Sequence, residues 1–286
     1  MNTSSLLHLF CLAILAVLFA CTPEAKDDLT KIKASNKLDD VVTDNTIVYM
    51  PTAIDMGTVV NGKNIKWASF NLGASKPEES GDYFAWAEVE PYYEEGHASD
   101  YNCYIWKKGK TMGYNWYSYK WINWEGGWLS RYVLETEDEE RYYFYDNKTE
   151  FVDYDYEDDA ARFILKKQWR TPTVDEWREL IDKCSWTGTF NYNGTKVCGF
   201  IVTATNGNSI FLPACGYRSD ISLSCRPDEF DHRCDYWSSS LCTDATFFTS
   251  QFAYSFSQAY STDFNPDWKM SKDYRYKGLP IRPVTE

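Results

Sequence analysis

The chain has little histidine, and this shortage argues against several classes of enzyme. Only 3 of its 286 residues are histidines, and His8 lies in an apolar N-terminal run, which leaves His97 and His232. A histidine-rich zinc site needs more histidine, and a Ser-His-Asp triad is usually marked by a serine in a Gly-x-Ser-x-Gly turn, which the sequence lacks. We therefore expect no catalytic residues, no metal and no cofactor.

Positive charge is also in short supply. The chain carries 29 lysines and arginines against 42 aspartates and glutamates, a net charge of −13 at neutral pH. Nucleic acid and anionic membrane surfaces repel a protein of this charge. We therefore expect no nucleic-acid partner and no direct membrane-surface contact.

Long apolar runs are missing except at the N-terminus. Residues 6–20 form one apolar run, too short to span a membrane comfortably, and it ends in Leu18-Phe19-Ala20-Cys21. This ending resembles the bacterial lipobox, in which the cysteine becomes the lipidated first residue. We expect residues 1–20 to be a lipoprotein signal peptide and Cys21 to carry the anchor; an ordinary signal peptide or an uncleaved anchor are the alternatives. The polar residues 21–45 are typical of a disordered tether.

Aromatic residues are abundant. They make up 17% of the chain, with 12 tryptophans and 22 tyrosines, which favours either a dense core or an aromatic binding face. The length fits one domain at 46–286, with a long insertion at about 92–151.

The order of expected elements is strands, then two helices, then strands, which predicts an α+β fold. Asn61-Gly62 predicts a hairpin turn between strands at 47–56 and 64–71. One helix is expected from Asp158 to about residue 167, and a second to begin after the capping box formed by Thr173 and Glu176. Further strands are expected at 187–192, 196–204, 209–215, 236–241 and 247–254, near 259 and into 284, with hairpin turns at Asn193-Gly194 and Asn206-Gly207.

Several motifs together resemble a known family. They are Lys-Trp-Ala-Ser-Phe-Asn-Leu-Gly at 66–73, Trp-Arg-Thr-Pro-Thr at 169–173, Leu-Pro-Ala-Cys-Gly-Tyr-Arg at 212–218, Tyr-Trp-Ser-Ser-Ser at 236–240 and Ile-Arg-Pro-Val at 281–284. The combination resembles the Fibrobacter succinogenes major paralogous domain, common in secreted and surface lipoproteins of the Bacteroidetes and Fibrobacteres. That domain is similar to the C-type-lectin-like and formylglycine-generating-enzyme folds.

The resemblance implies a C-type-lectin-like α+β domain with twisted antiparallel sheets, two helices and long loops. It also implies a lipid-anchored protein of the outer membrane or cell surface whose non-catalytic domain binds an extracellular glycan or protein. An enzyme of the formylglycine-generating type and a structural surface-layer protein are the alternatives. The Glu-Pro-Asn and Trp-Asn-Asp pairs of calcium-dependent sugar-binding lectins are missing, since Glu90-Pro91 is followed by Tyr92.

Five residues are expected to hold the core together. Trp67, Trp177 and Trp237 lie in apolar contexts, so we expect them to be buried. Arg218 and Arg282 stand beside apolar runs rather than in charged stretches, and an arginine so placed is usually held by carbonyls or a carboxylate.

The cysteine count is informative because an exported protein can form disulfides. Of nine cysteines, Cys11 is removed and Cys21 is lipidated, so the remaining seven cannot all pair within the chain. Cys225 and Cys234 flank a polar loop and are the expected disulfide. The formylglycine-generating enzymes bind copper through a cysteine pair. The resemblance to them implies, as an alternative to the disulfide, that Cys234 and Cys242 form such a copper-binding pair.

One acidic run has the spacing of a calcium loop at its start. Asp153, Asp155 and Glu157 alternate as the first three ligands would, but Asp158 stands where a glycine is needed and Ile164 occupies position twelve. We interpret the run as the acidic start of a helix.

The insertion contains a dense aromatic stretch between residues 101 and 128, interrupted by lysines and glycines. No helical or strand period places its rings on one buried face. One hypothesis is a ligand-binding rim that includes Trp116, Tyr117, Trp121 and Trp124, because exposed rings suit sugars and protein contacts. The alternative is a local minicore packed against the sheet, since large exposed apolar patches are rare.

Overall fold

The computed structural model describes residues 41–43, 46–91, 113–123, 128–135, 145–151, 157–166, 168–220, 222–224, 233–244, 249–259 and 270–286. The chain divides into two compact units, Met1–Val41 and Val42–Glu286, and the second contains the domain. The expected signal peptide, Cys21 and residues 22–40 of the expected tether lie outside the described residues. The first strand among the described residues is β1 (Val41–Thr43), which pairs with β2 (Thr46–Val48).

The first sheet of the domain contains the expected Asn-Gly hairpin. Strand β3 (Ala53–Val60) pairs antiparallel with β4 (Lys63–Ala68), and the last strand, β15 (Val284–Thr285), pairs with the other edge of β4. Asn61 and Gly62 have φ values of 51° and 76°, as a type I′ turn requires. The hairpin prediction is confirmed, although β3 starts later than expected.

The second sheet is a meander of β7 (Ser185–Thr189), β8 (Gly199–Thr203) and β9 (Ser209–Pro213). The turn expected at Asn193-Gly194 forms, since Asn193 and Gly194 have φ values of 48° and 81° and the N–H of Thr195 donates to the carbonyl of Tyr192 at 2.9 Å. The flanking strands are shorter than expected, because β7 ends at Thr189 and β8 begins at Gly199. The 3-10 turn η1 (Tyr192–Gly194) lies in this connection, where the ring of Tyr192 stacks on Phe211 with centroids 3.8 Å apart.

The third sheet has the order β12-β13-β14 and is antiparallel. Its strands are β12 (Arg233–Leu241), β13 (Phe252–Ala259) and β14 (Met270–Tyr274). Strand β14 was not expected, and β13 begins later than the predicted strand at 247–254. The remaining short elements are β5 (Ile122–Asn123), β6 (Trp128–Leu129), β10 (Tyr217–Ser219), β11 (Ser222–Ser224) and the 3-10 turn η2 (Thr249–Gln251).

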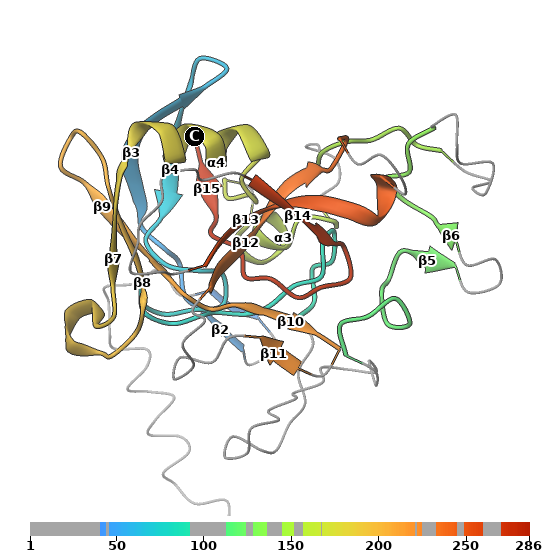
Figure 1. Ribbon diagram of the computed structural model, residues 1–286, viewed down its shortest axis with the longest axis horizontal. Coiled ribbons are helices and arrows are strands. Elements are labelled where there is room, and N and C mark those ends of the chain that lie inside the picture. Colours follow the sequence, from blue (N-terminus) through green and yellow to red (C-terminus); the bar gives the residue numbers. More distant parts are fainter. Residues whose placement is uncertain are drawn as a thin grey trace, which may run out of the picture. The chain divides into compact units, whose positions relative to one another are not determined.

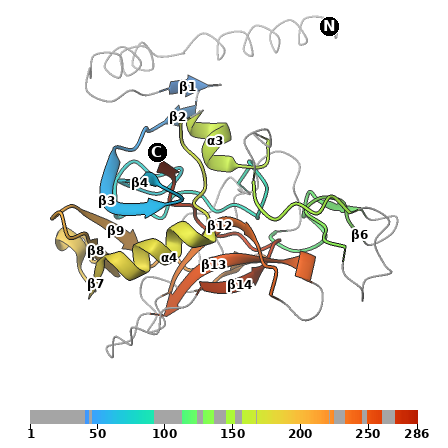
Figure 2. The same cartoon turned by 90° about the horizontal axis from the view of Figure 1, so that it is seen from above.

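Both expected helices form. Asp159 caps α3 (Ala160–Leu165) by accepting from the backbone N–H groups of the first turn. Helix α4 (Val174–Lys183) starts at Thr173, whose side chain and that of Glu176 complete the expected capping box. Helix α4 contacts β3 and all three strands of the β12-β13-β14 sheet, across which it lies in Figure 2.

The core is built on the expected tryptophans. Trp67 and Trp177 are 0% exposed and Trp237 is 1% exposed, which confirms their predicted burial. The rings of Trp67 and Trp177 meet edge to face at 4.7 Å between centroids, and Trp177 stacks on Phe256 at 5.0 Å. The Nε1 of Trp237 donates to the carbonyl of Phe84 at 2.7 Å, in a buried loop that also contains Trp86.

Arg282 joins three parts of the core. It is fully buried, and its guanidinium donates to Asn71 Oδ1 at 2.8 Å and to the carbonyls of Ala68 at 3.0 Å and Phe211 at 2.6 Å. Burial lowers the pKa of this guanidinium, and the three acceptors offset part of the desolvation cost. The expectation that carbonyls hold Arg282 is confirmed.

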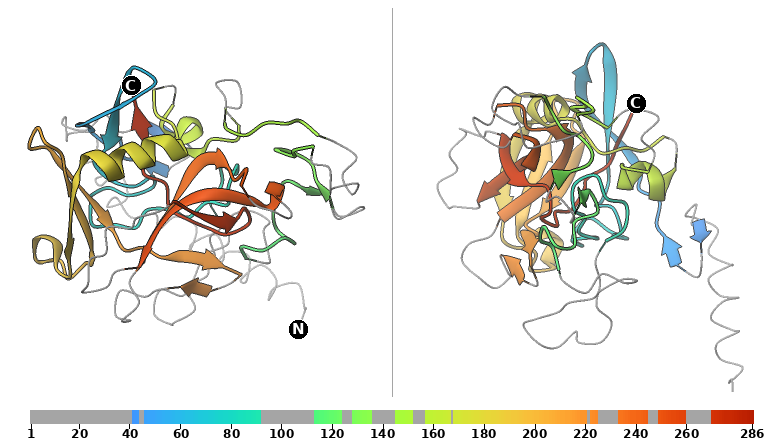
Figure 3. Two further views of the ribbon diagram at one scale, coloured as in Figure 1. Left: turned by 45° about the horizontal axis from the view of Figure 1, so that its top comes forward. Right: turned by 90° about the vertical axis from the view of Figure 1, so that its right-hand side faces the viewer.

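The domain is therefore a mixed α+β fold of mostly antiparallel sheets, with two α-helices among the described residues (Figures 1 and 3). This confirms the α+β class. Within the described part of the chain, no helix has the length and apolarity needed to cross a membrane.

Candidate functional site

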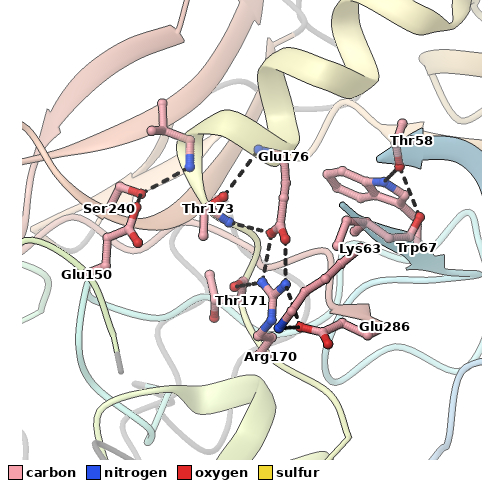
Figure 4. Close-up of polar contacts among 12 residues, drawn as sticks. Thr58, Lys63, Trp67, Glu150, Arg170, Thr171, Thr173, Glu176, Ser240 and Glu286 are labelled. Carbon is pink, nitrogen blue, oxygen red and sulfur yellow. Dashed lines mark hydrogen bonds and ion pairs between the residues drawn. The ribbon is translucent and has the colours of Figure 1, made fainter. Parts of the chain in front are cut away.

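One polar network surrounds the start of α4 and is shown in Figure 4. Arg170 donates from both terminal nitrogens to Glu176, at 2.7 Å and 2.5 Å, while Glu176 also accepts from the backbone N–H of Thr173. Close by, Lys63 pairs with Glu286 at 2.8 Å. The side chain of Glu176 is only 3% exposed, and its oxygens are committed to the helix cap and to Arg170. We interpret this network as structural.

A second polar network lies on one face of the β12-β13-β14 sheet. Alternation along β12 places Arg233, Asp235 and Trp237 on this face, and the register places Ser257 opposite Asp235 and Ser255 opposite Trp237. Asp273 on β14 also faces this side and accepts from Ser255 at 2.7 Å. We call Tyr217, Arg233, Asp235, Ser255, Ser257, Asp273 and Lys277 the charged cluster.

The charged cluster contains two similar units, each made of a cation, a carboxylate and a serine. In the first, Asp235 accepts from Ser257 at 2.5 Å and from Arg233 at 3.3 Å and 3.4 Å. In the second, Asp273 accepts from Ser255 at 2.7 Å and from Lys277 at 2.6 Å.

Tyr217 on β10 lies between the two units. Lys277 Nζ lies 4.2 Å from the centroid of its ring, and Arg233 Cζ lies 6.0 Å from the same centroid. Both distances are in the range of cation–π attraction. One aromatic ring therefore holds both cations of the charged cluster in place.

The cluster combines buried carboxylates with more exposed cations. Asp235 is 1% exposed, and burial raises the pKa of its carboxyl while Arg233 opposes the rise. Burial would lower the pKa of Lys277, but Asp273 outweighs it and the pKa is raised. The side chain of Arg233 is 34% exposed, more than those of Asp235, Lys277 and Asp273.

An aromatic group adjoins the charged cluster at the turn after β14. Tyr274 stacks with Phe252 at 4.4 Å and with Tyr276 at 5.4 Å, and Trp116 meets Tyr276 edge to face at 4.9 Å. We call Trp116, Phe252, Tyr274 and Tyr276 the aromatic cluster. Lys277 follows Tyr276 directly, and its N–H donates to the carbonyl of Tyr274 at 2.9 Å, so the two clusters meet at this turn.

The aromatic insertion packs back on the domain at several described positions. Tyr114 and Tyr119 are each 2% exposed, and the Nε1 of Trp121 donates to the carbonyl of Ala87 at 2.8 Å. Lys120 Nζ and Arg131 Cζ lie 4.3 Å and 4.9 Å from the centroid of the Trp121 ring. Trp121 is therefore held by the protein's own groups, as the minicore alternative expects.

Of the four rim residues proposed from the sequence, three belong to the described part of the chain. Trp116 is half-buried in the aromatic cluster and Trp121 is half-buried elsewhere against the domain, whereas Tyr117 is 66% exposed. Trp124 lies outside the described residues.

Arg275 was not anticipated from the sequence and is central to this region. It is fully buried, its Nε donates to Tyr119 at 2.9 Å, and its terminal nitrogens donate to the carbonyls of Tyr132, Ser250 and Arg131. The guanidinium carbon also lies 4.7 Å from the ring centroid of Trp86. Arg275 thus attaches the described part of the insertion to the turn where both clusters meet.

Arg218 lies against an aromatic ring and pairs with the chain at Gly278. Its guanidinium carbon lies 4.9 Å from the ring centroid of Tyr83, and its backbone N–H donates to the carbonyl of Gly278 at 2.7 Å. Arg218 therefore links β10 to the aromatic loop and to the chain that follows Lys277.

The structure records Cys234 as a free thiol, which differs from its expected pairing with Cys225, a residue outside the described ones. Cys234 is fully buried on the core face of β12 and donates to the carbonyl of Leu212 at 3.5 Å, so its thiol points into the core.

The alternative copper pair of Cys234 and Cys242 is wrong. The two residues lie at opposite ends of β12, and a strand rises by about 3.3 Å per residue, so the thiols are too far apart to share one metal ion. Burial also raises the pKa of Cys242 to about 11. Among the described residues, no group of three or more histidine, cysteine or acidic side chains could hold a metal ion.

The acidic run before α3 is only partly described. Asp153 and Asp155 lie outside the described residues, but Asp158 is buried and forms an ion pair with Arg131 at 2.6 Å. The hydroxyl of Tyr132 also donates to Asp158 at 2.9 Å. Asp158 thus helps to attach residues 131–132 to the start of α3.

Sequence reasoning missed both clusters, although part of the signal was present. The alternation in Arg-Cys-Asp-Tyr-Trp at 233–237 and the Ser-Phe-Ser at 255–257 indicate strands with one polar face. Asp273 and Lys277 could not be assigned to that face from the sequence, because apolar and polar residues do not alternate along β14.

Comparison of the chain with protein-family models, with curated proteins and with solved structures finds no match.

Proposed function

We propose that this protein is a lipid-anchored component of the cell envelope, at the outer membrane or cell surface. Its domain is a C-type-lectin-like member of the Fibrobacter succinogenes major paralogous family that binds an extracellular glycan or protein without catalysis. The α+β architecture and the lipobox-like end of the apolar run, Leu18-Phe19-Ala20-Cys21, support this proposal.

The observation that carries the binding part of the proposal is the meeting of the charged cluster and the aromatic cluster at one turn. Side chains from three separate segments, Trp116, Tyr217 and residues 273–277, come together there. Tyrosine and tryptophan combined with charged pairs supply both the apolar contact and the hydrogen-bonding groups that recognition sites use.

The chemistry of the charged cluster supports binding rather than catalysis. The hydroxyls of Ser255 and Ser257 both donate to carboxylates that a cation already pairs, so neither serine faces a free base. A nucleophile needs a base that accepts its proton. The charged cluster is better suited to ligand binding than to catalysis, because its hydrogen-bond donors and acceptors are held in fixed positions.

Two experiments test the proposal. Labelled fatty acid should enter the wild-type protein and not the Cys21→Ala variant, and equal labelling of both would refute the anchor.

The full chain in detergent should bind a component of a panel of extracellular glycans and proteins, and substitution of Tyr117 and Tyr274 should weaken that binding. Ligand binding that is unchanged by these substitutions would refute the proposed site.

A further inference from the structure

The charged cluster is balanced in charge, which restricts the ligands that it can hold. Arg233 is paired with Asp235 and Lys277 with Asp273. An anionic ligand would have to compete with these carboxylates for their cations, and the net charge of −13 on the chain would repel it at a distance. A cationic ligand would have to displace Arg233 or Lys277. The balance therefore favours an uncharged partner.

The same pairs suit a ligand rich in hydroxyl groups. The lysine ammonium has three donors and the carboxylate has several acceptor positions, so each has capacity beyond the bond of 2.6 Å between Lys277 and Asp273. Neighbouring hydroxyls of a sugar both donate and accept, and can therefore bond to an ammonium and a carboxylate side by side. The side chains of Lys277 and Asp273 are 18% and 13% exposed, which leaves part of the pair accessible.

The aromatic cluster adds apolar contact beside these hydrogen-bonding groups. Tyr274 is 37% exposed, and its stacking with Phe252 and Tyr276 already uses its ring faces. The edge of the Tyr274 ring remains available to a ligand, and it provides van der Waals contact to the apolar side of a sugar at low entropy cost.

We infer that the charged cluster binds an uncharged glycan through neighbouring hydroxyl groups, using its own side chains rather than a bound calcium ion. The inference rests on the proposed function and names the ligand class for the same site. A protein ligand, or an acidic glycan, would satisfy the proposed function but not this inference.

The test uses the full chain in detergent on an array of neutral oligosaccharides of glucose, mannose and galactose, together with uronic-acid-containing and sulfated ones. We expect binding to neutral oligosaccharides, unchanged by EDTA. Lys277→Met and Asp273→Asn should each weaken it at least tenfold, with an unchanged near-ultraviolet circular dichroism spectrum. Lys63→Met is the matched control, since Lys63 pairs with Glu286 at an exposed site and should leave binding unchanged.

A second measurement does not depend on variants. Affinity for an uncharged glycan should change little with ionic strength, whereas binding of an anion to exposed cations weakens as salt screens the charges. Preference for uronic-acid-containing or sulfated oligosaccharides, a steep salt dependence, or neutral binding that both variants leave intact would overturn the inference. Binding to protein ligands alone would overturn it too, while leaving the proposed function in place.

Discussion

Arg275 Nε donates a hydrogen bond of 2.9 Å to the phenolic oxygen of Tyr119, a residue 156 positions earlier in the chain. Both side chains are buried, and burial raises the pKa of the Tyr119 hydroxyl, so this phenol stays protonated. The bond connects the turn after β14 with the aromatic insertion. The placement of both clusters therefore depends on an arginine that is part of the core.

Arg275→Met should destabilise the domain by about 3 kcal/mol or more, because the carbonyls of Tyr132, Ser250 and Arg131 lose their donor in a buried site. Urea unfolding measures the difference. Arg178→Met is the control: its side chain is 52% exposed and pairs with Asp175, and its loss should cost less than about 1 kcal/mol. Equal stability of the two variants would contradict the role of Arg275.

Trp121→Ala should lower stability by about 2–3 kcal/mol, because it removes a half-buried ring and leaves the Ala87 carbonyl without its donor. Thermal unfolding of this variant and of Tyr117→Ala makes the comparison, since Tyr117 is 66% exposed and its loss should change stability by no more than about 0.5 kcal/mol. An unchanged Tm for Trp121→Ala would favour the rim hypothesis over the minicore.

The buried thiols should resist alkylation in the folded protein. Burial raises the pKa of Cys215 and of Cys242 to about 11, so almost no thiolate is present at mildly alkaline pH, and Cys234 is equally enclosed. Iodoacetamide followed by peptide mass spectrometry should find all three unmodified in the native state and modified in guanidinium chloride without reductant. Recovery of Cys234 linked to Cys225 would instead support the disulfide expected from the sequence.

Asp235 should make stability depend on pH in a defined direction. Burial raises the pKa of Asp235 in the folded protein above the value of about 4 expected in the unfolded chain. At pH values between these two pKa values, the folded state therefore binds more protons than the unfolded state. Stability from this group therefore falls as pH rises through that interval. Asp235→Asn, followed by urea unfolding at several pH values, should become more stable relative to wild type as the pH rises above about 4. A relative stability that is constant over this range, or that moves the other way, would contradict the assignment.

The features that the sequence predicted correctly depend on few, nearby residues. The capping box of Thr173 and Glu176 and the Asn61-Gly62 turn form within a few residues of chain, so their signals survive in any fold. At Asn193-Gly194 the turn also forms, but the strands on either side are shorter than the sequence predicted, and the ring of Tyr192 in this connection stacks on the distant Phe211.

The candidate site could not be predicted because its residues come from distant segments with weak local patterns. Asp273 and Lys277 belong to a polar strand and turn, and only the register of β14 against β13 brings Asp273 to Ser255. Arg275 stands between aspartate, tyrosine and lysine residues that look like surface, yet it is fully buried. Side-chain burial of this kind is set by tertiary packing rather than by local sequence.

The most direct test of the central claim is a binding isotherm for the full chain in detergent, with whichever neutral oligosaccharide or extracellular protein of the panel binds most tightly. The variants are Tyr117→Ser and Tyr274→Ser, whose side chains are 66% and 37% exposed; Tyr274 belongs to the aromatic cluster, and Tyr117 follows Trp116 of that cluster in the chain. The control is Phe190→Ser, 52% exposed on the β7-β8 connection. We predict that the tyrosine variants together raise Kd at least tenfold while the control leaves it unchanged. An unchanged Kd in the tyrosine variants would contradict the assignment of ligand binding to this surface.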